Sequence, residues 1–138
     1  MTIIKENVKS VQEFNYLYDA VGWGVYEDDN IVKSALDNTY YSVSIYNDDK
    51  IIGYGRLIGD TTCFMYIHDV IVVPEYQGKK IGTMIMNKLL DKINELKTIN
   101  PDIRVYLGAS TGKEKFYEHF GFIDRKDANL GAGMILKD

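Results

Sequence analysis

The stretch VIVVPEYQGKKIGTMIM, residues 70–86, decides the fold. Four apolar residues lead into Pro74, the segment QGKKIG follows, and the apolar spacing then becomes helical. This pattern predicts a buried strand that passes through a short turn directly into a helix. The first turn of a helix carries unpaired backbone N–H groups and a partial positive charge, and glycines let an anion approach the backbone. With Lys79 and Lys80 adding positive charge, the sequence predicts a phosphate-binding turn.

Two better-known phosphate-binding patterns do not match this turn. It is neither G-x-x-x-x-G-K-[ST] nor G-x-G-x-x-G. Taken alone, the turn is equally compatible with a solvated strand–helix connection in which Gly78 and Gly82 serve only the backbone geometry.

The composition indicates one cytoplasmic domain over residues 1–138. Of these 138 residues, 46% are hydrophobic and 26% are charged, as in ordinary globular chains. The N-terminus lacks a signal peptide, and no apolar run is long enough for a membrane span. The single Cys63 excludes an internal disulfide, and one cysteine with two histidines argues against a metal site. A net charge of −4 argues against nucleic acid and agrees with a cationic substrate.

Hydrophobic periodicity predicts an α+β fold outside this stretch. Residues 8–21 and 28–38 have helical spacing, and Asp28 or Asp29 would cap the second helix with Ile31, Ala35 and Leu36 facing inward. The segment NDDK is typical of a hairpin turn. The expected order is β-α-α-β-β-β-α-β-α-β, with strands at 2–6, 40–46, 50–58, 63–73, 103–109 and 133–137 and later helices at 81–96 and 113–120.

Two motifs in this chain resemble those of one known family. VVPEYQGKKIGTMIMNKLL resembles the acyl-CoA-binding motif of the GNAT superfamily of N-acetyltransferases, [QR]-x-x-G-x-[GA] after a strand that ends in Val-x-Pro. Gln77 and Gly82 match this motif, whereas Lys80 stands in place of its middle glycine. KFYEHFGF, residues 115–122, resembles the second motif of the family, in which a tyrosine precedes Gly-Phe. The order of the predicted elements agrees with that fold over nearly the whole chain.

The resemblance implies a mixed, mainly antiparallel twisted sheet that is flanked by helices, with splayed central strands that receive the thioester of acetyl-CoA. The pantetheine arm would pair with the backbone of Ile71, Val72 and Val73. If Lys80 must adopt a positive φ, its side chain strains the turn by about 1 kcal/mol, which its charge could offset at a phosphate. The residues implied to hold the pyrophosphate are Gln77, Gly78, Lys79, Lys80, Ile81, Gly82 and Thr83.

Acetylation of an amine needs a proton acceptor, an oxyanion donor and an acid for the departing thiolate. The resemblance implies that Tyr117 is this acid. The resemblance makes His68 the candidate base, since a histidine at this place relays the proton of the amine in the arylalkylamine branch of the superfamily. His68 stands four residues before Val72, so alternation places both on one face of the strand. Asp69, expected on the other face, and water are the rival bases, and a packed structural role is the alternative for both His68 and Tyr117. The N–H of Val72 is the expected oxyanion donor.

The acceptor pocket is predicted in the segment YDAVGWGVYEDDN. Trp23, Tyr26 and Glu27 combine aromatic surface with negative charge, which suits a cation with an apolar body. A solvated acidic cap of the following helix explains the acidic residues equally well.

The predicted function is therefore transfer of an acetyl group from acetyl-CoA to the primary amine of a small molecule in a ternary complex. The alternatives are a non-catalytic CoA-binding module of the same fold, a protein N-terminal or lysine acetyltransferase, and a binder of another nucleotide. The expected partner is the small amine, with no metal, nucleic acid or membrane, and a homodimer is allowed.

Overall fold

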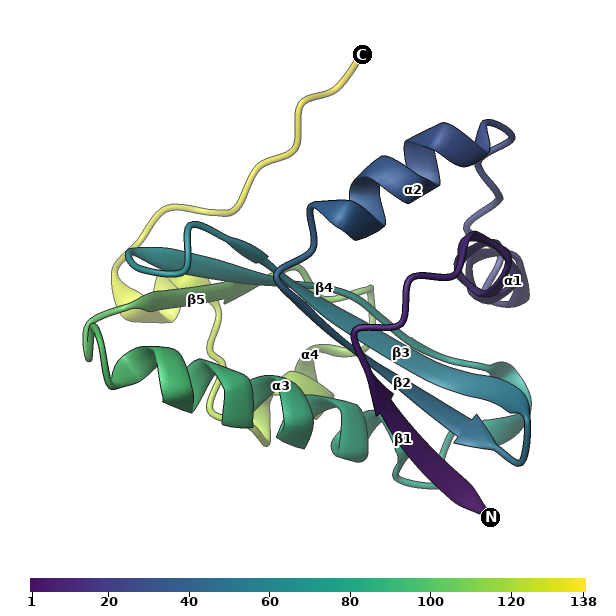
Figure 1. The fold of residues 1–138 in the computed structure, drawn as a ribbon. Coiled ribbons are helices and arrows are strands. Elements are labelled where there is room, and N and C mark those ends of the chain that lie inside the picture. Colours follow the sequence, from purple (N-terminus) through teal and green to yellow (C-terminus); the bar gives the residue numbers. More distant parts are fainter. The chain divides into compact units, whose positions relative to one another are not determined.

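The computed structural model describes residues 1–138 as two compact units, residues 1–106 and 107–138. The first unit carries a five-stranded sheet with the order β1-β2-β3-β4-β5 (Figure 1). The pairs β1–β2, β2–β3 and β3–β4 are antiparallel. The sequence prediction of an α+β fold with a mainly antiparallel sheet is confirmed. The strands are β1 (Thr2–Glu6), β2 (Tyr41–Asn47), β3 (Lys50–Gly59), β4 (Phe64–Val72) and β5 (Arg104–Leu107).

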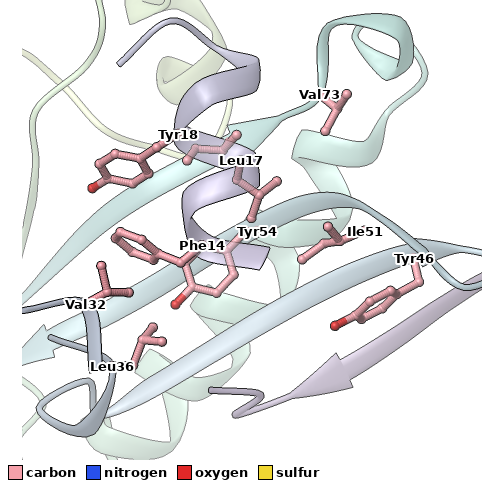
Figure 2. Packing of buried hydrophobic residues seen from close by; sticks show 10 residues of the cluster. Phe14, Leu17, Tyr18, Val32, Leu36, Tyr46, Ile51, Tyr54 and Val73 are labelled. Carbon is pink, nitrogen blue, oxygen red and sulfur yellow. The ribbon is translucent and has the colours of Figure 1, made fainter. Parts of the chain in front are cut away.

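Helices cover both faces of this sheet. Helices α1 (Val11–Ala20) and α2 (Asp29–Asp37) lie over one face, and α3 (Ile81–Lys97) lies over the other (Figure 1). The core under α1 and α2 combines their apolar residues with aromatic residues of the strands, such as Tyr46 and Tyr54 (Figure 2). Burial of these apolar surfaces between the layers is the main stabilising contribution.

Local capping fixes where the first two helices begin. The Ser10 side chain accepts a hydrogen bond from the N–H of Glu13, so α1 begins three residues later than the apolar spacing suggested. Asp28 caps α2 by accepting from the N–H of Asn30. In α2 the buried residues are Val32 and Leu36, whereas Ile31 is exposed, so its predicted inward position is wrong. No helix combines the length and the apolarity that a membrane crossing requires.

Helix α3 approaches β3 closely at two glycines. A Cβ atom added to Gly53 would lie 2.7 Å from a methyl group of Ile81, and one added to Gly55 would lie 2.6 Å from a methyl group of Ile85. Both distances are too short for a real contact. The two glycines therefore set the distance at which α3 packs on the sheet.

A β-bulge interrupts the pairing of β3 with β4. Two residues of β4, Asp69 and Val70, stand opposite the single residue Gly55 of β3. Asp69 adopts a φ of 54°, in the left-handed region that few residues with side chains occupy. Its side chain is nonetheless buried. The bulge therefore adds one residue to an otherwise regular antiparallel ladder.

This bulge changes which side chains share a face. His68 pairs with Arg56, and Val72 pairs with Gly53. Arg56 and Gly53 are three residues apart and so point to opposite faces, with Gly53 toward α3 and Arg56 toward α2. The expectation that His68 and Val72 share a face, with Asp69 opposite, is wrong. His68 and Asp69 instead lie together on the face that carries α1 and α2.

The second unit contains the short helix α4 (Glu114–Glu118) and a 3₁₀ turn at Arg125–Ala128. Gly121 follows α4 with a φ of 92°, which a glycine adopts without strain, and ends the helix as predicted. Residues 133–137 have no regular secondary structure, and Met134, Ile135 and Leu136 are exposed. The predicted last strand is therefore wrong, because a run of apolar residues does not form a strand without a neighbour that accepts its hydrogen bonds.

Candidate active site

His68 and Asp69 form a hydrogen-bonded pair on the face of β4 that carries α1 and α2. His68 Nδ1 lies 2.8 Å from Asp69 Oδ1, and the His68 side chain is 47% exposed whereas that of Asp69 is fully buried. Because a carboxylate only accepts, Nδ1 is the donor, and a neutral ring then presents the lone pair of Nε2. The arrangement can therefore take up a proton from a group that approaches Nε2.

Two further donors hold the buried carboxylate of Asp69. The Tyr18 hydroxyl of α1 donates to Oδ1 over 2.5 Å, and Arg56 Nε of β3 donates to Oδ2 over 2.6 Å. Burial alone would raise the pKa of Asp69, but hydrogen bonds from His68 and Tyr18 and the Arg56 charge outweigh it and lower the pKa. Burial and the bond to Asp69 raise the pKa of Tyr18. Asp69 is therefore ionised at neutral pH, and Tyr18 keeps its proton.

The predicted phosphate-binding turn lies exposed between β4 and α3. Gly78 has a φ of 78°, and Lys80, immediately before α3, has φ 66° and ψ 16°. Lys80 thus adopts the left-handed conformation on which the predicted strain depends. Lys79 lies over the ring of Tyr76, with Nζ 5.2 Å from the ring centre. No acidic residue lies in the first turn of α3, so this helix end keeps its positive potential.

The backbone of Val72 points away from β3. The N–H of Val73 donates to Ile52 O over 2.9 Å, and hydrogen-bonded positions alternate along an antiparallel strand. The N–H and C=O of Val72 therefore point to the opposite side, where β5 is the next strand of the sheet. Gln77 reaches back from the turn and donates from Nε2 to Val72 O over 3.0 Å. The motif glutamine thus ties the turn to the end of β4.

The loop after α1 presents two aromatic side chains. Trp23 and Tyr26 are 48% and 47% exposed. Both rings pack against Tyr18, with ring centres 5.3 Å and 6.0 Å away. The side chain of Asn15 fixes the loop through hydrogen bonds to the N–H and C=O of Tyr26. Through Tyr18, Trp23 and Tyr26 are therefore connected to the pair of His68 and Asp69. Glu27 is exposed to solvent.

Tyr117 lies on α4 in the second unit. Its ring packs edge-on against Phe116 and Phe122, at 5.0 Å and 6.4 Å between ring centres. Burial raises the pKa of Tyr117, so the hydroxyl is protonated at neutral pH and can donate. The role of Tyr117 as an acid stays a prediction.

Sequence reasoning missed Tyr18 and Arg56. Tyr18 follows the helical spacing of a core residue and carries no signal of its own. Arg56 does carry one, because an arginine within the apolar strand KIIGYGRLI requires a buried acidic partner.

Comparison with known proteins agrees with this architecture. The acetyltransferase (GNAT) domain family matches residues 11–136. An uncharacterized N-acetyltransferase ycf52 of Gracilaria tenuistipitata var. liui is 30% identical over 128 residues, which cover 88% of this chain and 66% of that protein. The chain thus spans slightly less than two thirds of this relative.

Two solved structures are similar over the whole chain. A probable acetyltransferase from meticillin-resistant Staphylococcus aureus is 26% identical, with a TM-score of 0.87 and complete coverage of both chains. An acetyltransferase of the GNAT family from Streptococcus pneumoniae is 25% identical, with a TM-score of 0.82 and coverage of 100% of this chain and 98% of that chain. The matched domain, the fold and the two motifs together show that this chain belongs to the GNAT family of acetyltransferases.

Proposed function

We propose that this protein transfers an acetyl group from acetyl-CoA to the primary amine of a small molecule. The observation that carries the proposal is the pairing of half-exposed His68 with buried Asp69 on the strand that leads into the glycine-containing turn. A proton acceptor and an anion-binding helix end thereby belong to one continuous segment, residues 68–83. Acetyl transfer from a phosphorylated donor to an ammonium group needs both.

Acetyl-CoA is proposed to bind through the turn and the end of β4. The first N–H groups of α3, with Lys79 and Lys80, suit a pyrophosphate. The peptide groups of Val72 point away from β3 and suit hydrogen bonds to the pantetheine arm or to an oxyanion. No side chain of the turn competes for these groups apart from Gln77, which binds Val72 O.

The proposed chemistry begins with proton removal from the acceptor ammonium by His68 Nε2. The amine lone pair then attacks the thioester carbonyl carbon, and the N–H of Val72 stabilises the oxyanion. Collapse of this intermediate breaks the C–S bond, and Tyr117 gives its proton to the departing CoA thiolate. The nitrogen loses its second proton to solvent as the amide forms, and solvent returns a proton to Tyr117. Direct transfer of this kind requires both substrates to be bound together.

We assign the base to His68 and give Asp69 the task of holding the ring. Asp69 accepts from three donors and has a lowered pKa, so it has little capacity to take a further proton. His68 has an exposed edge and one uncommitted nitrogen, as an acceptor of a substrate proton requires.

The acceptor is proposed to lie against Trp23 and Tyr26. Their exposed rings suit the apolar body of an amine or its cation, and the net charge of −4 favours a cationic partner.

The test measures release of the CoA thiol with a panel of small primary amines and, separately, with peptides that carry a free N-terminus or lysine. Gly82→Asp places a carboxylate where the pyrophosphate would approach, and acetyl-CoA affinity should fall about tenfold or more, that is by about 1.4 kcal/mol. Gly131→Asp, at an open position in the second unit, adds the same charge and should bind normally.

Each result separates two of the alternatives. CoA binding without thiol release would indicate a non-catalytic module, and release with peptides alone would indicate a protein acetyltransferase. Unchanged acetyl-CoA affinity in folded Gly82→Asp would overturn the proposed phosphate site.

A further inference from the structure

The carboxylate of Asp69 joins three elements of the first unit at one point. Oδ1 accepts both from the Tyr18 hydroxyl of α1, at 2.5 Å, and from His68 Nδ1 of β4, at 2.8 Å. Oδ2 accepts from Arg56 Nε of β3 at 2.6 Å. The same arginine donates from Nη1 to Ala35 O, in the last turns of α2.

We propose that Tyr18 is a positioning residue for His68, acting through the oxygen of Asp69 that they share. The proposal rests on the proposed function, in which His68 is the base. Tyr18 keeps Oδ1 turned toward His68, so that the ring carries its proton on Nδ1 and leaves Nε2 as the acceptor. Tyr18 is not itself placed against a substrate.

The geometry explains why the second donor is needed. An arginine tends to bind a carboxylate through two parallel hydrogen bonds, one to each oxygen. Arg56 makes only one such bond to Asp69, from Nε to Oδ2, while its Nη1 donates to Ala35 O and to Thr39 Oγ1, the latter at 3.1 Å. Without the Tyr18 hydroxyl, the carboxylate is free to turn both oxygens toward Arg56 and away from His68.

Tyr18 also connects this pair to the loop with the exposed aromatic rings. Its ring packs against Trp23 and Tyr26, and its carbonyl oxygen accepts from the N–H of Trp23 over 2.9 Å. A displacement of the loop therefore reaches His68 through only Tyr18 and Asp69. If the acceptor binds on this loop, Tyr18 both contacts the acceptor-binding loop and orients His68 through Asp69.

The other groups around the carboxylate are few. Tyr54 of β3 faces it at longer range, and the ring of Tyr66 lies 5.8 Å from that of His68. Neither donates a hydrogen bond to Asp69 in the structure, so Tyr18 and Arg56 are its fixed donors besides His68.

The test removes one hydroxyl and observes which ring nitrogen of His68 carries the proton. Tyr18→Phe keeps the packing against Phe14 and Trp23. Tyr46→Phe is the matched control, because Tyr46 is also a residue of the core and its hydroxyl donates to a carboxylate, Glu13 Oε1, at 2.7 Å. Nitrogen-15 NMR of the neutral histidine rings distinguishes the two tautomers, and His119→Gln assigns the two signals.

In the wild type and in Tyr46→Phe, we expect neutral His68 to be mainly in the Nδ1–H form. In Tyr18→Phe the share of this form should fall about twofold or more, since the partner of one ring nitrogen sets the tautomer. The kcat/KM for the acceptor should fall about tenfold or more with acetyl-CoA affinity unchanged, as when a supporting carboxylate contact is lost.

Two outcomes would overturn the inference. One is a wild-type His68 that carries its proton on Nε2, and the other is an unchanged tautomer in folded Tyr18→Phe. Both are read from the protein alone, without a substrate. If no amine is acetylated by the wild type, the proposed function fails, and the NMR result still decides the role of Tyr18.

Discussion

Lys80 is the residue at which this chain departs from the acyl-CoA-binding motif, and its conformation has an energetic cost. A residue with a Cβ atom in the left-handed region loses about 1 kcal/mol or more relative to glycine. Lys80→Gly should therefore raise the free energy of unfolding by about 1 kcal/mol, measured by urea denaturation. If the lysine charge contacts a phosphate, acetyl-CoA binding should at the same time become weaker and less sensitive to salt.

Lys79→Gly is the control for this substitution. Lys79 is a neighbour of the same charge and exposure, but it does not have a positive φ. Glycine there should leave the stability unchanged or lower it slightly. Equal effects at both positions would show that backbone strain at Lys80 is negligible.

Tyr117 is expected to protonate the departing thiolate. Tyr117→Phe retains the ring that packs against Phe116 and Phe122 and removes only the hydroxyl. The rate of transfer should fall roughly 10²-fold, the scale of general acid catalysis, whereas acetyl-CoA should still bind. Single-turnover measurements and calorimetry separate the two properties. Full activity of the variant would leave the thiolate to be protonated by water.

Among single residues of the site, the sequence predicts those that belong to a motif or are of an unusual residue type for their position. It misses those whose role comes only from a contact made in the folded protein. His68, Lys80 and Trp23 are recognisable before folding. Tyr18 is not, because its importance comes from a carboxylate 51 positions away along the chain. The bulge at Asp69 also escapes prediction, since strict alternation is the only rule that a strand sequence offers.

The contact of α3 with β3 is the element-scale feature most open to test. Because a Cβ at Gly55 would lie 2.6 Å from a methyl group of Ile85, Gly55→Ala should push α3 outward. Overpacking of this kind costs about 1–3 kcal/mol. Gly131→Ala is the control, with no atom within 4 Å of the added methyl group. Similar denaturation midpoints for the two variants would contradict the close packing.

The long, strongly periodic elements are those that the sequence predicts well. Helix α3 was expected at 81–96 and occupies Ile81–Lys97, and the hairpin of β2 and β3 turns at Asp48 and Asp49 as expected. Residues 133–137 were expected as a strand and are not one. A helix satisfies its own hydrogen bonds, whereas a strand depends on a neighbour that its own sequence does not specify.

At the scale of the whole molecule, the eleven tyrosines predict how stability depends on alkaline pH. Burial raises the pKa of Tyr54 to about 12, and the pKa values of Tyr18, Tyr41 and Tyr46 are raised as well. Tyrosines of the unfolded chain lose their protons near pH 10, while these side chains keep theirs in the folded protein. The folded state then binds more protons, so the free energy of unfolding should fall as pH rises above 10.

For Tyr54 alone, the two-unit difference in pKa corresponds to about 2 kcal/mol of the free energy of unfolding lost by pH 12. Urea denaturation at pH 8, 10 and 11 measures this decline. Tyr54→Phe should flatten it and cost little at pH 8, because the buried hydroxyl has no hydrogen-bond partner to lose. A decline of unchanged steepness in that variant would show that other groups control alkaline unfolding.

The bulge in β4 also shows which residue the strand could lose without a change of register. His68 and Ile71 pair with β3 residues two apart, as in a regular ladder, so the register on both sides would survive the loss of one codon between them. The hydrogen-bonded register of the sheet thus does not require the extra residue. A strand without it would keep its apolar residues against α3 and lose the carboxylate that accepts from His68, Tyr18 and Arg56. A single in-frame deletion therefore separates a plain structural strand from one in which a buried carboxylate holds the proposed base.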